Sequence, residues 1–148
     1  MLHGLVSLRL AEGGSRAPAV AVATLASAIA AHVHAWAAPE HLSLQPVLGV
    51  GFLLAAFFQG AFAAAVPFRS GSGWLIWLGV AVNLVLILAG VTAHTPGQPL
   101  AVLLAHQHAP GTDLLEQIAL MAEAAVVPGL VCLLPFRSTV SAGGAIHK

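Results

Sequence analysis

The sequence predicts an all-α, polytopic membrane protein built as a four-helix transmembrane bundle, and three observations support this fold class. Hydrophobic residues make up 59% of the 148 residues and charged residues only 7%. A soluble domain carries about 25% charged residues, so this chain has too few to cover a water-facing surface. Mean hydropathy is +0.94. Finally, four apolar stretches are long enough to cross a bilayer core, which takes roughly 20 helical residues.

The predicted helices cover about residues 17–38, 46–68, 74–93 and 114–136. Chain-breaking residues lie between them: Pro39, the Ser70-Gly71-Ser72-Gly73 turn, Thr95-Pro96-Gly97 and Pro110-Gly111. Gly and Pro are the strongest local signals for turns, so these positions predict the connections between spans.

The basic residues predict the orientation. They are Arg9, Arg16, Arg69, Arg137 and Lys148. All five fall on the same side if both termini are cytoplasmic, and Lys and Arg are enriched in cytoplasmic loops. We therefore predict an N-in/C-in protein, with cytoplasmic tails at 1–16 and 138–148 around a transmembrane domain at 17–137.

The N-terminus also has features of a cleaved signal peptide. Arg9 and Arg16 precede an apolar stretch, and the Ala-Trp-Ala tripeptide at 35–37 loosely matches a cleavage site. However, the apolar run is longer than a usual signal-peptide core, and cleavage would discard His32 and His34. We therefore favour a retained first helix.

Charge and cysteine content exclude several classes of function. The formal net charge is zero, so no basic surface exists to neutralise nucleic-acid phosphates. Cys132 is the only cysteine, which excludes an internal disulfide and a cysteine-based zinc site. The sequence contains no nucleotide-binding loop, no Ser–His–Asp arrangement and no nucleophile-elbow motif, so an enzyme is the less favoured interpretation.

Histidine is unexpectedly abundant, since eight histidines outnumber five acidic residues. In the predicted topology, six histidines and three acids converge on the outer end of the bundle. Neutral imidazole is the commonest metal ligand and also titrates near physiological pH. We predict a metal site with ligands drawn from His34, His41, His94, His106, His108 and Glu116. This mixture of nitrogen and oxygen ligands suits copper(II), zinc or iron, and haem is a further candidate. The alternatives are a proton or pH-sensing role and histidines that simply lie in the headgroup region.

The spacing of the histidine pairs limits which of them can act together. His106 and His108 lie in a predicted loop, where residues i and i+2 of an extended backbone point the same way. His32 and His34 have the same spacing in a predicted helix, where they diverge by about 200°. Only one of the latter two can therefore face the bundle.

A second polar group is predicted near the middle of the membrane. Glu123, Gln59, Asn83 and Ser27 fall at similar depths on the four helices. An ionised carboxylate at the bilayer centre costs about 2.5–3.5 kcal/mol on insertion scales, so we expect Glu123 to face the bundle with a partner. One interpretation is a protonated Glu123 bonded to Gln59 or Asn83. The other is a proton relay or cation site that uses Glu116 and Glu123, which are two turns apart.

Small residues favour close packing of the helices and an association with other chains. The first predicted helix is rich in alanine, and the second contains Gly49, Gly51 and Gly60. Small residues allow membrane helices to approach closely. The expected partners are the lipid bilayer and a homodimer or larger membrane complex, with no nucleic acid.

The pattern resembles a family of small, uncharacterised four-helix membrane proteins of actinobacterial type. The residues that carry the resemblance are His34, Pro39, His41, Phe57-Phe58-Gln59, Arg69, Asn83, Thr95-Pro96-Gly97, Pro99, Asp113 and Glu123. The resemblance implies a bacterial plasma membrane and no assigned reaction. An arginine is often found in that family where this chain has His94, which implies a structural cation at that position in place of a metal ligand.

Three functions remain open at this stage. The preferred hypothesis is a small membrane protein that binds a transition metal or haem at its outer face. The second is a structural accessory subunit of a larger membrane complex. The third is a proton-coupled carrier that uses Glu123 and Gln59 and acts as a dimer.

Overall fold

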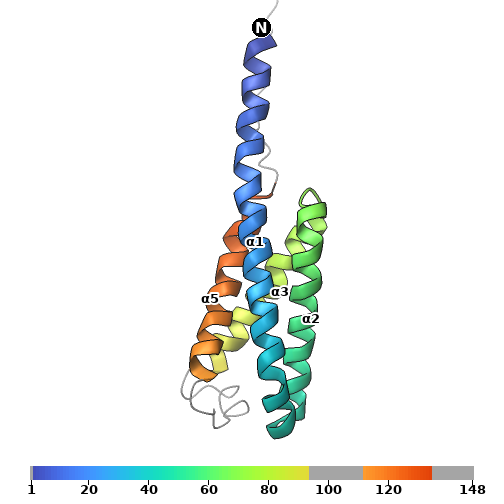
Figure 1. Ribbon diagram of the computed structural model, residues 1–148, viewed down its shortest axis with the longest axis vertical. Coiled ribbons are helices and arrows are strands. Elements are labelled where there is room, and N and C mark those ends of the chain that lie inside the picture. Colours follow the sequence, from blue (N-terminus) through green and yellow to red (C-terminus); the bar gives the residue numbers. More distant parts are fainter. Residues whose placement is uncertain (1, 94–111, 135–148) are drawn as a thin grey trace, which may run out of the picture.

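A computed structural model describes residues 2–93 and 112–134, with side chains described for 16–92 and 114–134. The helices in these ranges are α1 (Leu2–Leu44), α2 (Pro46–Arg69), α3 (Gly73–Ala93) and α5 (Thr112–Val131). All regular secondary structure in the described residues is helical, which confirms the all-α prediction (Figure 1).

The four helices each contain a segment that is long and apolar enough to cross a membrane. These segments are Arg16–Leu44, Pro46–Arg69, Gly73–Thr92 and Leu114–Val131. Large apolar side chains such as Leu54, Phe57, Val85, Leu88 and Met121 point out of the bundle. So much exposed apolar surface is stable in contact with lipid chains and not with water. The chain is therefore a multi-pass membrane protein.

The helix α1 is longer than the hydropathy pattern predicts, because it continues through Pro39 to Leu44. A proline in a helix removes one N–H donor, and membrane helices tolerate this where neighbouring helices support the backbone. A single non-helical residue, Gln45, then separates α1 from α2, and its N–H bonds to the His41 carbonyl at 2.7 Å. His41 therefore lies in the last turns of a helix and not in a loop.

The packing is organised around α1. Its most extensive contact is with α2 and its second is with α5, while α3 packs mainly against α5. Figure 1 shows α1 beside α2 and α5, with its N-terminal part extending beyond the other helices. The α1–α2 hairpin closes tightly at Gly49, where an added Cβ would overlap the backbone of Leu42.

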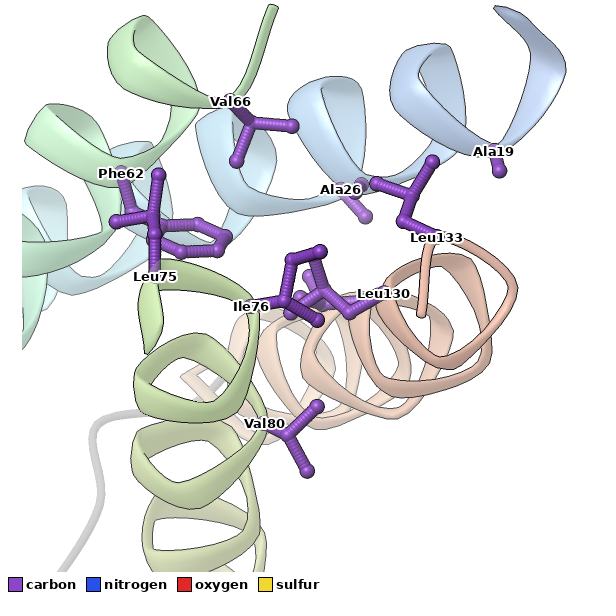
Figure 2. Close-up of a cluster of buried hydrophobic side chains, with 11 residues drawn as sticks. Ala19, Ala26, Phe62, Val66, Leu75, Ile76, Val80, Leu130 and Leu133 are labelled. Carbon is purple, nitrogen blue, oxygen red and sulfur yellow. The ribbon is translucent and has the colours of Figure 1, made fainter. Parts of the chain in front are cut away.

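A hydrophobic cluster fills the end of the bundle where α2 ends, α3 begins and α5 ends (Figure 2). Its buried members are Ala19, Ala23, Ala26, Phe62, Val66, Leu75, Ile76, Val80, Val126, Leu130 and Leu133. Gly79 of α3 is essential to this packing, since a Cβ there would overlap the Phe62 ring and approach Leu130 Cδ1 to 2.8 Å. We refer to this group below as the hydrophobic cluster.

Candidate functional site

Four polar side chains, one from each helix, are buried together in the middle of the bundle. Gln59 and Asn83 are 0% exposed, Glu123 is 3% exposed and His34 is 8% exposed. Gln59, Asn83 and Glu123 each lie at the middle of their own membrane span. We call these four residues the polar layer.

The shortest contact in the polar layer joins α1 to α5. His34 Nε2 and Glu123 Oε1 are 2.8 Å apart and share a hydrogen bond, although 89 positions separate them in the chain. A lone charge at this depth is costly, but an imidazole and a carboxylate that share a proton can form a pair with no net charge. The pair therefore explains how Glu123 is accommodated within the membrane span.

Amide side chains extend this contact to the other two helices. Gln59 Nε2 donates to both Glu123 Oε1 and Asn83 Oδ1, each at 3.4 Å. Asn83 Nδ2 donates to the carbonyl of Gly79 on its own helix at 2.8 Å. Hydrogen bonds between membrane helices contribute about 0.6–2 kcal/mol each, so this network stabilises the arrangement of all four helices.

Some buried polar atoms nearby have no hydrogen-bond partner within the described part of the chain. They include His34 Nδ1, Gln59 Oε1 and Ser27 Oγ. An unsatisfied buried polar atom costs about 1–3 kcal/mol, and such atoms are rare in native structures. His34 is thus bonded through Nε2, while its buried Nδ1 has no partner among the described residues.

The two sides of the polar layer differ in character. Towards the hydrophobic cluster, one helical turn away, lie the buried side chains of Phe62, Val80 and Val126. Towards the opposite end, the Phe52 ring lies 5.4 Å from the His34 ring in an edge-on contact and 4.2 Å from the His41 ring in a stacked one. Among the described side chains, buried or half-buried titratable groups therefore continue from the layer towards this end, whereas the polar atoms on the cluster side are the buried hydroxyls of Thr24 and Ser27.

That end contains further residues predicted for the site. His41 is 3% exposed, and its Nδ1–H donates to the Ala37 carbonyl at 2.9 Å. Glu116 is half-buried one heptad before Glu123 on α5, just as His34 lies one heptad before His41 on α1. A spacing of seven residues is two helical turns, so each pair lies on nearly one face.

The predicted divergence of the first histidine pair is confirmed, because His34 is buried and His32 is exposed. The other predicted ligands, His94, His106 and His108, lie outside the described residues. Within the described ranges, no group of three or more His, Cys, Asp or Glu side chains could hold a metal ion. The metal site therefore stays a prediction.

Sequence reasoning missed the partnership of His34 with Glu123. It placed His34 with the outer histidines and paired Glu123 only with Gln59 or Asn83. The physical reason is the length of α1: because the helix runs on to Leu44, His34 lies deeper than a helix ending at Pro39 would place it. The sequence left Gln59 and Asn83 open as partners of Glu123, and in the structure Gln59 makes the contact.

No protein-family model, curated protein or solved structure matches the chain. The resemblance to the actinobacterial family therefore stays a prediction, and functional inference depends on the residues themselves. Fold and site together define a small multi-pass helical membrane protein with a buried, ionisable polar layer in the middle of its spans.

Proposed function

We propose that this protein binds and exchanges a proton at the His34–Glu123 pair, within the membrane. The observation that carries the proposal is the 2.8 Å contact between a buried imidazole and a buried carboxylate. Both groups can hold a proton, and imidazole does so near physiological pH. Ionisable residues within membrane spans commonly mark proton relays or ion pathways.

The chemistry of the pair favours a functional role over helix association alone. Gln59 and Asn83 show that neutral amides are sufficient to link helices at this depth. A glutamine at position 123 would provide the same links without an ionisable group, at a lower cost of insertion. The presence of His34 and Glu123 in place of amides is therefore explained by proton exchange.

The surroundings of the pair favour exchange with one side only. The hydrophobic cluster fills the bundle on one side of the polar layer, whereas His41 and Glu116 lie towards the other. The distribution of Lys and Arg favours an orientation with the polar end outside and both termini in the cytoplasm, which we propose to be that of a bacterial cell. We propose that protons reach the pair from the extracytoplasmic side of the plasma membrane.

Few other charged groups influence the pair. In the described side chains of the elements packed on α1, the titratable groups are Glu116 and Glu123 on α5 and Arg69 at the far end of α2. Of these groups, Glu123 is the one in direct contact with His34. Proton exchange at the His34–Glu123 pair is consistent with a proton-coupled carrier that acts as a homodimer, or with a proton-responsive subunit of a larger membrane complex.

Infrared difference spectroscopy of reconstituted protein tests the proposal. We expect an acid jump outside the vesicles to change imidazole and carboxyl bands in the native protein, and Glu123→Gln to remove the part of this change that comes from the His34–Glu123 pair. Glu40→Gln is the matched control, because Glu40 lies outside the polar layer and should leave the signal intact. An unaltered difference spectrum in Glu123→Gln would overturn the proposal.

A second candidate function is metal binding near the outer end, and one observation favours it. His34 is held by a carboxylate through one nitrogen while the other has no partner in the described residues. Metal-bound histidines are usually oriented in this way by a carboxylate or a carbonyl. The proposed further ligands are His41, His94, His106, His108 and Glu116, and the proposed metals are copper, zinc or iron, with iron either free or as haem.

Metal analysis of untagged protein in mild detergent tests this second function. Near-stoichiometric metal that is lost in His34→Ala and retained in His32→Ala would support it, since His32 is exposed. Loss in the double variant His106→Ala/His108→Ala would extend the ligand set to those positions. A metal-free protein that takes up no added copper, zinc or iron would contradict it.

A further inference from the structure

The orientation of the Asn83 side chain is determined by its helix. Its Nδ2 lies 2.8 Å from the carbonyl oxygen of Gly79. A carbonyl oxygen only accepts hydrogen bonds, so the NH₂ group must face it and Oδ1 must point away. The opposite amide orientation would bring two oxygens together at this distance.

The orientation of the Asn83 amide in turn determines the orientation of the Gln59 amide. Oδ1 of Asn83 and Oε1 of Glu123 both lie 3.4 Å from Gln59 Nε2. Because both are acceptors, Gln59 must present its NH₂ group between them. The reverse orientation would place three oxygens together in a buried site, where unpaired polar groups are most costly.

The same comparison of donors and acceptors determines which atom carries the proton between His34 and Glu123. Glu123 Oε1 accepts from Gln59, and it is also the oxygen that lies 2.8 Å from His34 Nε2. A hydroxyl oxygen is a weaker acceptor than a carboxylate oxygen, so the donor from Gln59 disfavours a carboxyl proton on Oε1. Nε2 is then the donor, and the second ring nitrogen, Nδ1, has no partner in the described residues.

We propose that Asn83 and Gln59 are positioning residues that hold one proton on His34 Nε2 and leave Nδ1 as the unpartnered ring nitrogen of the layer. That a proton is what binds at Nδ1 rests on the proposed function. Exchange then consists of a proton passing from a hydronium ion to Nδ1: an O–H bond of the hydronium breaks and leaves water, and an N–H bond forms. The imidazole becomes an imidazolium, the Nε2–H bond to the carboxylate is kept, and no electron transfer is involved.

This assignment explains why the layer contains two amides that do not titrate. Without the two amides, Glu123 could carry its proton on Oε1 and donate it to Nε2. The lone pair of the unprotonated ring nitrogen would then already be engaged in a hydrogen bond. With the two amides present, the Glu123 carboxylate accepts from both Gln59 and His34. The atom that exchanges a proton is then the second ring nitrogen of His34, Nδ1. The Gly79 carbonyl thus orients the amide of Asn83, Asn83 orients the amide of Gln59, and both Gln59 and His34 donate to Glu123.

Nitrogen NMR of protein labelled with ¹⁵N-histidine tests the proposal, with His34 assigned by its loss in His34→Gln. At alkaline pH we expect a protonated Nε2 and an unprotonated Nδ1, and acidification should alter mainly Nδ1. In Gln59→Met, which removes the donor at similar volume, we expect the ratio of the two ring tautomers to fall by about tenfold, the effect of one charge-assisted hydrogen bond. Ser27→Ala is the matched control, because it removes a buried polar atom that makes no bond in the described residues.

The outcomes separate this inference from the proposed function. An unprotonated Nε2 in the native protein, or an unchanged tautomer ratio in Gln59→Met, would overturn the positioning role of Asn83 and Gln59. The expected tautomer in a protein whose His34 never gains a second proton would support the positioning role and overturn proton exchange. If Gln59→Met fails to fold, Asn83→Leu provides the same test one step further from the carboxylate.

Discussion

At the residue scale, Glu123 has two partners of different chemistry. Its Oε1 is bonded to the ring of His34 and to the amide of Gln59. The stability of the bundle depends on Oε1 as an acceptor, and the proposed proton exchange depends on an ionisable group. Substitutions can therefore separate the two roles.

We expect Glu123→Gln to change the free energy of unfolding by less than about 1 kcal/mol, because the amide oxygen still accepts from both partners. Glu123→Leu leaves the donors of His34 and Gln59 unpaired, and each buried unpaired group costs about 1–3 kcal/mol. Thermal unfolding in detergent compares the two variants. Equal melting temperatures for both would show that the network contributes little to stability.

At the element scale, close approach of the helices depends on Gly49 and Gly129 and not on Gly51. A Cβ at Gly49 would overlap the Leu42 backbone, whereas one at Gly129 would lie 3.3 Å from Ala23 N. A Cβ at Gly51 meets nothing within 4 Å. The first position closes the α1–α2 hairpin and the second lies between α1 and α5.

This predicts a graded series of alanine variants. Gly49→Ala should destabilise most, by roughly 1–3 kcal/mol, because backbone must move to relieve the overlap. Gly129→Ala should have a smaller effect, and Gly51→Ala should match the native protein or exceed it slightly, since alanine is a better helix former. Unfolding in sodium dodecyl sulfate ranks the three variants, and a destabilised Gly51→Ala would argue against the α1–α2 packing.

The helices were predictable from the sequence, but the contacts between them were not. Apolar runs of about 20 residues are set by bilayer thickness, so hydropathy alone locates the spans. Whether Pro39 ends a helix depends on neighbouring helices, which local sequence does not record. Because α1 was expected to end near Pro39, the predicted depth of His34 was too shallow and its bond to Glu123 was not predicted.

At the scale of the whole molecule, the proposed direction of proton access requires the orientation given by the basic residues. It can be tested with single cysteines in a Cys132→Ser background. Ser43 is exposed at the end of α1, and Gly71 is exposed in the α2–α3 turn with no atom within 4 Å of an added Cβ. These two positions lie at opposite ends of the bundle.

We expect a membrane-impermeant maleimide to label Ser43→Cys in intact cells, and to label Gly71→Cys only after permeabilisation. This result would place the His41 end outside and the hydrophobic cluster towards the cytoplasm. The opposite labelling pattern would reverse the direction of proton access while leaving the polar layer itself unaffected.

Counting protons tests the central claim most directly. A potentiometric difference titration compares the purified native protein with the Glu123→Gln/His34→Gln double variant in the same detergent, with Ser27→Ala as the control because it removes no titratable group. Proton exchange at the pair predicts that the native protein and the control bind one more proton per chain on acidification than the double variant. Identical titration curves for all three proteins would show that the pair exchanges no proton and that the polar layer only holds the helices together.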